Sequence, residues 1–246
     1  MIGYEIIHKE IVDSTNNYLT NLVHDGKISH GVVILAEQQT SGRGQRNANW
    51  QSDKKQNLLF SYYTKYNQLN ISEQFLITQY VSSAIHSYLY SIGISASIKW
   101  PNDILVGTHK ICGVLIENQL QGQHIKGSIV GIGLNINQEK FNESTITSLK
   151  LIFGEKLNVL NVLNGLLIHL NNFFNQLTNL KKEEIQKYYL ENLWLYEKTG
   201  NFRSENMNFQ GIIKGTDEFG RLKVLINNTI RIFDLKEITF LDRNAI

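Results

Sequence analysis

The chain has 246 residues, of which 42% are hydrophobic and 19% are charged, and its formal net charge is +2. This length and hydrophobic content suffice for one large domain, or for one domain with a small appendage. A charge so close to zero argues against a general affinity for nucleic acid or for anionic membranes. The sequence therefore predicts a soluble globular protein.

The sequence shows no targeting segment and favours a reducing compartment. Residues 1–12 carry charges without a long apolar run, which argues against a signal peptide. Nowhere do ~18 apolar residues follow one another, so no membrane span is expected. Cys112 is the only cysteine, which rules out an internal disulfide. We expect a cytoplasmic protein.

Apolar periodicity and helix-ending glycines define the elements of the first half. The predicted elements are a helix that follows Asp13-Ser14-Thr15, strands over 32–35 and 58–64, a polar loop over 40–52 and a helix over 72–92. Gly26 and Gly93 can terminate the two helices. A buried sheet with at least one long helix is therefore expected here.

The second half changes from strands to helices and then to short strands. The predicted elements are strands over 94–100, 104–106, 111–118 and 125–136, helices near 159–177 and 183–193, and three to five short strands between 209 and 241. We therefore expect an α+β catalytic domain over 1–198, with a mixed, mostly antiparallel sheet and helices on one face. A small SH3-like β-barrel domain is expected over 199–246.

The loop that ends at Trp50 has the composition of an anion-binding site. Its two glycines let a ligand approach main-chain N–H groups, which suit carboxylate or phosphate oxygens. Arg43 and Arg46 add fixed charge and forked donors, and Trp50 can pack on a flat ring. An exposed basic turn is the alternative that these residues leave open.

The run Lys99-Trp100-Pro101-Asn102-Asp103 contains the only proline of the chain. Pro101 fixes its own φ and holds Trp100 extended, so the geometry of the turn is preset. Asn102 and Asp103 form turns readily and can also bind a ribose or a phosphate-bound metal. A plain strand–turn–strand corner with a packed tryptophan is the alternative.

Two later segments add further groups. Lys110 begins an otherwise apolar run, where its ammonium can reach a carboxylate or a phosphate, although a surface lysine is the alternative. Cys112 is interpreted as a core residue because no histidine adjoins it. The alternate glycines of 131–137 allow close approach of a ligand. The sequence contains no dinucleotide fingerprint, P-loop, zinc spacing or Gly-x-Ser-x-Gly elbow.

Taken in order, these motifs resemble those of the bacterial biotin–protein ligases. The order is Asp-Ser-Thr-Asn, Gln-x-x-Gly-Arg-Gly-x-Arg-x-x-x-Trp, Lys-Trp-Pro-Asn-Asp, Lys-x-x-Gly-x-Leu-x-Glu and Gly-x-Gly-x-Asn. Each element alone is weak to moderate, but five in this order are specific. The resemblance covers residues 10–140 and implies a class II synthetase-like catalytic domain. Since Asp13 lies so near the start, it implies the short form without a DNA-binding domain, and we expect no DNA binding.

The resemblance also implies the chemistry. Such enzymes use ATP to convert the biotin carboxylate to biotinyl-5′-AMP and then transfer biotin to one lysine of a biotin carboxyl carrier protein. Cations and Mg²⁺ are needed because the first step brings two anions together. ATP, Mg²⁺ and biotin are therefore the expected ligands, and the sequence leaves open whether the chain forms a homodimer. A lipoate–protein ligase is the nearest alternative, and a non-catalytic binding module is the alternative from another class.

The resemblance assigns roles residue by residue. The implied catalytic residues are Lys110 and Arg43. The implied biotin-binding residues are Ser14, Thr15, Asn16, Gln39, Gly42, Arg43, Gly44, Gln45, Lys110, Gly113 and Gly131. The implied ATP-binding residues are Arg46, Trp50, Lys99, Asn102, Asp103 and Asn135. The metal ligands stay unassigned.

Two positions depart from the family pattern. Many relatives have arginine where this chain has Gln45, and they often have a further basic residue where Ala48 stands. One cation over the reaction intermediate is therefore missing. We expect this chain to release the intermediate more readily than a relative that carries arginine there.

Overall fold

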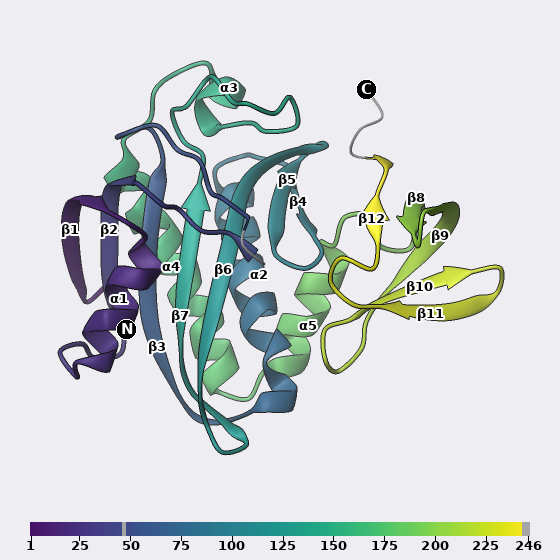
Figure 1. The fold of residues 1–246 in the computed structure, drawn as a ribbon, viewed down its shortest axis with the longest axis horizontal. Helices are drawn as coiled ribbons and strands as arrows, with labels where there is room; N and C mark the ends of the chain where they lie inside the picture. Colours follow the sequence, from purple (N-terminus) through teal and green to yellow (C-terminus); the bar gives the residue numbers. More distant parts are fainter. Residues whose placement is uncertain (46–47, 243–246) are drawn as a thin grey trace.

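The computed structural model describes residues 1–45 and 48–242 and contains one seven-stranded and one five-stranded sheet (Figure 1). The strands of the large sheet are β1 (Glu5–Val12), β2 (Val32–Gln39), β3 (Leu58–Asn70), β4 (Ala96–Lys99), β5 (Asp103–Val106), β6 (His109–Gln121) and β7 (His124–Leu134). Their order is β1-β2-β3-β7-β6-β5-β4, and only the β1–β2 pair is parallel. The predicted mixed, mostly antiparallel sheet is confirmed.

Helices cover both faces of this sheet. They are α1 (Thr15–His24), α2 (Phe75–Ser91), α3 (Leu149–Phe153), α4 (Val159–Thr178) and α5 (Lys182–Glu191), and a single 3-10 turn (Ile71–Glu73) precedes α2. The three long helices of the main core, α2, α4 and α5, lie on one face, as predicted. α1 departs from the expectation of helices on one face, because it packs on the opposite face in a smaller cluster around Leu19 and Ile34 (Figure 1).

Residues 32–36 of β2 and 58–63 of β3 are largely apolar because both faces of these strands are buried there. On β3, Tyr62 belongs to the main core on the face covered by α2, α4 and α5, whereas Tyr63 belongs to the cluster on the α1 face. Neighbouring residues of a strand point to opposite faces, so an uninterrupted apolar run is expected for a strand covered on both sides. The predicted strands over 32–35 and 58–64 are this kind of strand.

The edge strand β1 was not predicted, and it decides where the site forms. Its burial pattern shows no regular alternation, and Ile6 and Ile11 are exposed. It pairs with β2 in parallel through α1, in a register that ends at Val12↔Gln39. Because parallel strands end at the same edge of a sheet, the first turn of α1 comes to lie beside Gln39.

The C-terminal sheet consists of β8 (Thr199–Ser204), β9 (Met207–Thr216), β10 (Leu222–Ile226), β11 (Thr229–Phe233) and β12 (Thr239–Phe240) in the order β11-β10-β9-β8-β12. It begins ten residues earlier than the predicted start at 209. In β8 the buried positions are Gly200, Phe202 and Ser204, so small residues hide the alternation. The SH3-like form of this sheet stays a prediction.

The stability of the fold should depend on pH through a buried histidine between α2, α5 and β4. His86 Nε2 lies 3.2 Å from the carbonyl oxygen of Ala96, and Nδ1 lies 3.0 Å from the hydroxyl of Tyr188. The carbonyl can only accept, so Nε2 carries the proton and Nδ1 accepts from the tyrosine. Burial lowers the pKa of His86 below its ordinary value of 6.5.

Acidification below about pH 6.5 is therefore expected to destabilise the protein. The unfolded chain takes up a proton at the ordinary histidine pKa whereas the folded chain does not, so the free energy of unfolding is unaffected by this histidine above that pH and decreases as the pH is lowered below it. It then falls with a limiting slope of about 1.4 kcal/mol per pH unit for each such group. Urea unfolding at pH 7.5 and 5.5 tests this. The pH dependence should weaken in His86→Gln and not in a control at the exposed His24; equal weakening in both would contradict the assignment.

Candidate functional site

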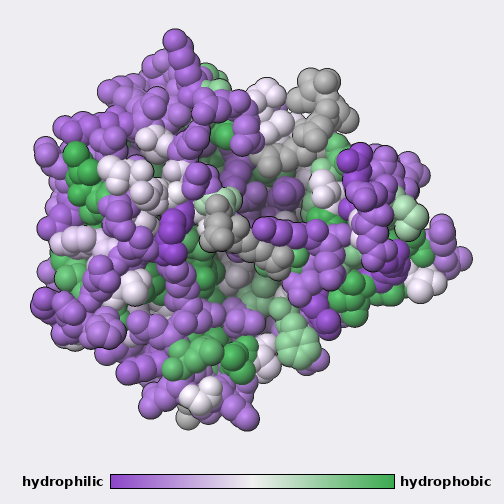
Figure 2. Space-filling model, viewed as in Figure 1, coloured by the Kyte–Doolittle hydropathy of each residue, from purple (hydrophilic) through white to green (hydrophobic). Residues whose placement is uncertain are grey.

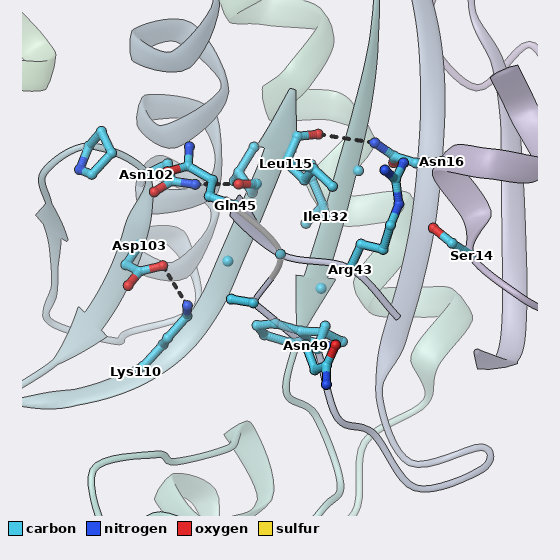
Figure 3. A pocket seen from close by; sticks show the side chains of 18 of the residues that line it. Ser14, Asn16, Arg43, Gln45, Asn49, Asn102, Asp103, Lys110, Leu115 and Ile132 are labelled. Atoms are coloured by element: carbon cyan, nitrogen blue, oxygen red, sulfur yellow. Dashed lines mark hydrogen bonds and ion pairs between the residues drawn. The ribbon is translucent and has the colours of Figure 1, made fainter. Parts of the chain in front are cut away.

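A cavity of about 270 Å³ opens on the α1 side of the large sheet (Figure 3), and polar residues dominate this face of the molecule (Figure 2). β6 and β7 form its floor, and its walls come from α1, from residues 43–45 and 48–50 of the loop, and from the run 99–103. The predicted site residues among its lining are Ser14, Thr15, Asn16, Gln39, Arg43, Gly44, Gln45, Trp50, Lys99, Asn102, Asp103, Lys110, Gly113 and Gly131. Groups from all the motif segments thus meet in one place.

Two predicted site residues of the described structure, Gly42 and Asn135, do not line the cavity. Gly42 is buried beneath the loop, where an added Cβ would lie 2.4 Å from the carbonyl oxygen of Trp50. Asn135 follows β7 and donates to the carbonyl oxygen of Thr147 at 3.1 Å. Arg46 lies outside the described residues. Gly42 therefore shapes the loop, and Asn135 holds the segment behind the floor.

The floor is bare because three glycines on two neighbouring strands face the cavity. Gly113 on β6 pairs with Gly133 on β7, and the indole of Trp50 lies directly on both. A Cβ at Gly133 would lie 2.4 Å from Cε2 of Trp50, and a Cβ at Gly113 would lie 2.9 Å from Cζ3. At Gly131 a Cβ would lie 2.1 Å from Oδ1 of Asn16. Trp50 and Asn16 therefore occupy space that side chains would otherwise fill.

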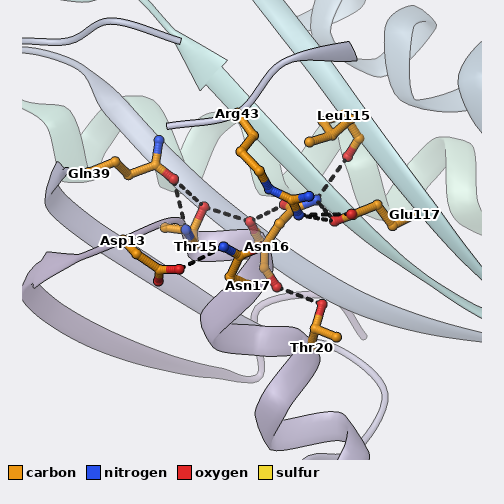
Figure 4. Close-up of polar contacts among 10 residues, drawn as sticks. Asp13, Thr15, Asn16, Asn17, Thr20, Gln39, Arg43, Leu115 and Glu117 are labelled. Carbon is orange, nitrogen blue, oxygen red and sulfur yellow. Dashed lines mark hydrogen bonds and ion pairs between the residues drawn. The ribbon is translucent and has the colours of Figure 1, made fainter. Parts of the chain in front are cut away.

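One end of the cavity is a network of neutral polar groups at the start of α1 (Figure 4). The amide N–H and hydroxyl of Thr15 lie 2.8 and 3.0 Å from Oε1 of Gln39. The hydroxyl of Ser61 lies 2.7 Å from that of Thr15 and 2.6 Å from Oδ1 of Asn16. Ser14 is the N-cap of α1, but its hydroxyl makes no capping hydrogen bond. Such a set of fixed donors and acceptors suits a small polar ring.

The loop above the floor is folded back on itself. Its first residues are tied to the end of β1, because Thr40 and Ser41 donate to the carbonyl oxygens of Val12 and Asp13, both at 2.9 Å. Further along, the amide of Trp50 donates to the carbonyl oxygen of Gly42 at 2.9 Å. This hairpin holds the side chains of its two ends over the glycine floor.

Lys110 and Arg43 reach the cavity from different sides (Figure 3), and Lys99 also lines it. Lys110 Nζ lies 2.6 Å from Oδ1 of Asp103 and 5.5 Å from the centroid of the Trp50 ring. The lysine side chain is only 24% exposed, so its charge is partly shielded from water. Arg43 pairs with Glu117, with Nη2 2.8 Å from Oε1. A ligand between these groups would meet positive charge at two points.

The C-terminal sheet and α5 hold the run 99–103 in place. Trp100 Nε1 donates to the carbonyl oxygen of Gly220 at 2.8 Å, and the hydroxyl of Tyr189 donates to the carbonyl oxygen of Pro101 at 3.0 Å. Lys99 Nζ lies 5.1 Å from the ring centroid of Phe240. The peptide bond before Pro101 is cis, which the sequence analysis did not predict. The predicted fixed turn therefore has support from both parts of the chain.

Sequence reasoning did not find several residues of the site. Ser61 resembles a small core residue within an apolar strand, and only its pairing with Gly131 shows that it lies on the cavity side of the sheet, beneath the polar groups of α1. Gly133 was noted in a motif but not assigned to the site, although it carries the Trp50 ring. Glu117 was likewise only part of a motif. The alternation of each strand, combined with the register, is the signal that would have found them.

Three further properties of the described residues concern a metal group, a reactive thiol and a membrane-spanning helix. Within residues 1–45 and 48–242, no three His, Cys, Asp or Glu side chains form a group that could hold a metal ion. Cys112 is buried, and burial raises the pKa of its thiol well above the ordinary range, which excludes a thiolate nucleophile at neutral pH. Over the same residues, none of the helices has the length and apolar character that crossing a membrane requires.

Comparisons with known proteins place the chain in a family. Residues 9–135 match the Biotin/lipoate A/B protein ligase family. The bifunctional ligase/repressor BirA of Bacillus subtilis is 28% identical over 180 residues, which cover 68% of this chain and 53% of that protein. The biotin–[acetyl-CoA-carboxylase] ligase of Mycobacterium tuberculosis is 28% identical over 129 residues, which cover 51% of this chain and 47% of that protein. The chain thus spans about half the length of the curated relatives it matches.

Solved structures agree with this placement. The biotin protein ligase from Aquifex aeolicus in complex with biotin and ATP is 25% identical, with a TM-score of 0.78 over 96% of this chain and 98% of that one. The Leishmania major enzyme in complex with biotinyl-5-AMP, at 22% identity, shares the fold with a TM-score of 0.62 over 94% of this chain and 99% of that one. The chain belongs to the Biotin/lipoate A/B protein ligase family.

Proposed function

We propose that this chain is an ATP-dependent biotin–protein ligase, which forms biotinyl-5′-AMP and transfers biotin to a lysine of a biotin carboxyl carrier protein. The observation that carries the proposal is the glycine-floored cavity with Arg43 and Lys110 reaching in from two sides. The Mycobacterium tuberculosis relative is named as a biotin ligase, and the Aquifex aeolicus structure holds biotin and ATP together. Both findings support the proposal.

The neutral polar end of the cavity suits the ureido ring of biotin. Thr15, Asn16 and Gln39 present hydroxyl and amide groups there, and Ser61 connects them. The part of the cavity beside the Trp50 ring leaves room for the apolar part of the molecule. The carboxylate of biotin would then point away from this end, toward the two cations.

Lys110 and Arg43 would make adenylation possible by offsetting negative charge. The carboxylate must attack the α-phosphate, and both groups are anionic, so the transition state needs fixed cations around it. Lys110 can turn from Asp103 toward the phosphate because the ion pair joins the two side chains through one carboxylate oxygen. The folded loop would also keep water away from the mixed anhydride.

The run 99–103 would hold the ATP side. Asp103 is the only carboxylate among the described residues that line the cavity, which is too few oxygen ligands for a protein-built magnesium cage. Mg²⁺ usually binds through one or two carboxylates together with substrate phosphates. We therefore infer that Mg²⁺ enters with ATP and that Asp103, with Asn102 beside it, contacts the bound complex.

The wider assignments rest on the same proposal. We infer a catalytic domain over 1–198 and a second domain over 199–246, which the start of β8 at Thr199 supports. The cytoplasm is the proposed location because ATP and carrier proteins meet there. Pairing of two copies of the chain stays a prediction.

Biotin-dependent exchange between ATP and labelled pyrophosphate tests the proposal. Rapid exchange is expected with biotin and little with lipoate, since the polar end presents an amide-rich surface rather than a pocket for a dithiolane. Exchange that responds to lipoate instead would show a lipoate ligase. No exchange with either acid would show a binding module and contradict the proposed activity.

Substitution of Gln45 by arginine is expected to slow release of the intermediate by about tenfold. Gln45 lies in the loop and lines the cavity, and an added guanidinium there would form a charge-assisted contact worth about 1.4 kcal/mol, or a factor of ten. Purified protein is loaded with biotin and ATP, and the loss of biotinyl-5′-AMP is followed after dilution. Equal release rates in wild type and Gln45→Arg would contradict this expectation.

A further inference from the structure

Glu117 on β6 joins the two walls of the cavity. Its Oε1 and Oε2 atoms accept hydrogen bonds from Nη2 of Arg43 at 2.8 and 2.9 Å. Oε2 also accepts a hydrogen bond from Nδ2 of Asn16 at 2.6 Å (Figure 4). One carboxylate therefore contacts both the charged loop residue and a residue of the polar end.

Strand geometry explains why Glu117 reaches this position. Gly113, Leu115 and Glu117 are alternate residues of β6, so they share the face that forms the cavity floor. Glu117 pairs across the sheet with Ile129, which lies beneath α1. Its carboxylate thus stands at the border between the bare floor and the first turn of α1.

The pair with Glu117 leaves part of the guanidinium of Arg43 available. Within the part of the chain that the structure describes, the hydrogen bonds of Arg43 to Glu117 use Nη2 alone. A guanidinium has five N–H donors, and those on Nε and Nη1 can still bind a second anion. Glu117 can therefore hold the arginine while Arg43 binds a ligand carboxylate.

The same carboxylate fixes the amide of Asn16. Because Nδ2 of Asn16 donates to Glu117, its Oδ1 must be the atom that faces Ser61, at 2.6 Å. The hydroxyl of Thr15 donates its one proton to Oε1 of Gln39. The proton of the Ser61 hydroxyl therefore goes either to Oδ1 of Asn16 or to the oxygen of Thr15. By fixing the amide of Asn16, Glu117 therefore also influences the hydrogen bonding of Ser61 at the polar end of the cavity.

We propose that Glu117 is a positioning residue, which holds Arg43 ready for the ligand carboxylate and Asn16 ready for the polar ring before any ligand binds. The proposal rests on the proposed biotin ligase function. A half-exposed ion pair contributes little to folding, and the two side chains are 40% and 36% exposed. We therefore expect the Glu117–Arg43 ion pair to contribute to ligand binding, because side chains that are already held in place lose less entropy on association.

Biotin and biotinol, the alcohol that lacks the carboxylate, separate the two effects of Glu117. Calorimetric titration of wild type, Glu117→Ala and Glu117→Gln with both ligands gives the affinity ratio of biotin to biotinol. Glu117→Ala is expected to weaken biotin by about ten- to a hundredfold, since charge-assisted contacts are worth about 1.5–3 kcal/mol. The affinity of this variant for biotinol should fall less, so the affinity ratio of biotin to biotinol decreases. Glu117→Gln should keep part of the wild-type affinity, because the amide oxygen of glutamine still accepts a hydrogen bond from Asn16.

The matched control is Glu73→Gln, which removes a carboxylate paired with Lys182 Nζ at 2.5 Å, neither of which lines the cavity. It should leave the ratio unchanged. An unchanged ratio in folded Glu117→Ala and Glu117→Gln would overturn the proposal, and so would tighter biotin binding, because it would mean that Glu117 competes with the ligand for Arg43. Wild type that binds neither ligand would refute the proposed function as well.

Discussion

Replacing Lys110 by glutamine is expected to lower the rate of biotin adenylation by about two to three orders of magnitude, the usual effect of losing one fixed group that stabilises transition-state charge. Lys110 Nζ lies 2.6 Å from Asp103 and faces a cavity that also contains Arg43. Glutamine has a similar length but no charge. It would leave the attacking carboxylate and the α-phosphate without the cation that offsets their repulsion.

The measurement is biotin-dependent ATP–pyrophosphate exchange, combined with calorimetric binding of biotin. Exchange should fall far more than biotin affinity, because the ammonium acts mainly on the charge that develops during the reaction. Lys126→Gln provides the control, since this lysine is exposed on the neighbouring strand β7 and lies away from the cavity lining. Full exchange activity in Lys110→Gln would show that the reacting atoms lie elsewhere in the molecule.

The elements that the sequence predicts well are those whose pattern is local. α2 and α4 have long apolar faces and lie within one to three residues of their predicted bounds. The buried strand β2 was found from the uninterrupted apolar run 32–35. β1 was missed because few side chains of this edge strand are buried, so its sequence shows no clear apolar pattern, and Ile6 and Ile11 are exposed. Its place depends on a parallel pairing with β2 that only the folded chain reveals.

The site was predicted as a set of motifs, and their meeting could not be derived from spacing. Thr15 and Gln39 are 24 residues apart and Asn16 and Glu117 are 101 apart, yet each pair is hydrogen-bonded. The family resemblance supplied the expectation that such residues form one site. The register of β3, β6 and β7 supplies the physical reason, because it sets Ser61, Gly131 and Leu115 in one row across the floor.

The sequence could not show which groups the cationic side chains contact in the folded chain. The motifs indicated Lys110 and Arg43 as groups for anions, but both already have carboxylate partners in the structure, Asp103 and Glu117. An anionic ligand must therefore share or displace those partners. Binding thus depends on the neighbours of each cation as much as on the cation itself.

Replacing Gly133 by valine is expected to weaken biotin binding by about ten- to a hundredfold. Even a single Cβ there would lie 2.4 Å from Cε2 of Trp50, and the two further methyl groups of valine make the overlap worse. The ring must leave the floor, and with it the end of the loop that the Trp50 amide ties to Gly42. Overpacking of this kind costs about 1–3 kcal/mol, which a ligand that needs the closed loop must overcome.

Calorimetry with biotin measures the affinity, and tryptophan fluorescence reports whether Trp50 moves into water. Folding should change little, because valine is favourable in a strand and the loop lies at the surface. Val130→Ala, three residues earlier on the same strand, in the main core on the other face and away from the cavity lining, is the matched control and should bind biotin as wild type does. Wild-type affinity in Gly133→Val would mean that the ligand does not need Trp50 on the glycine floor, and that the bare floor serves only the packing of the empty protein.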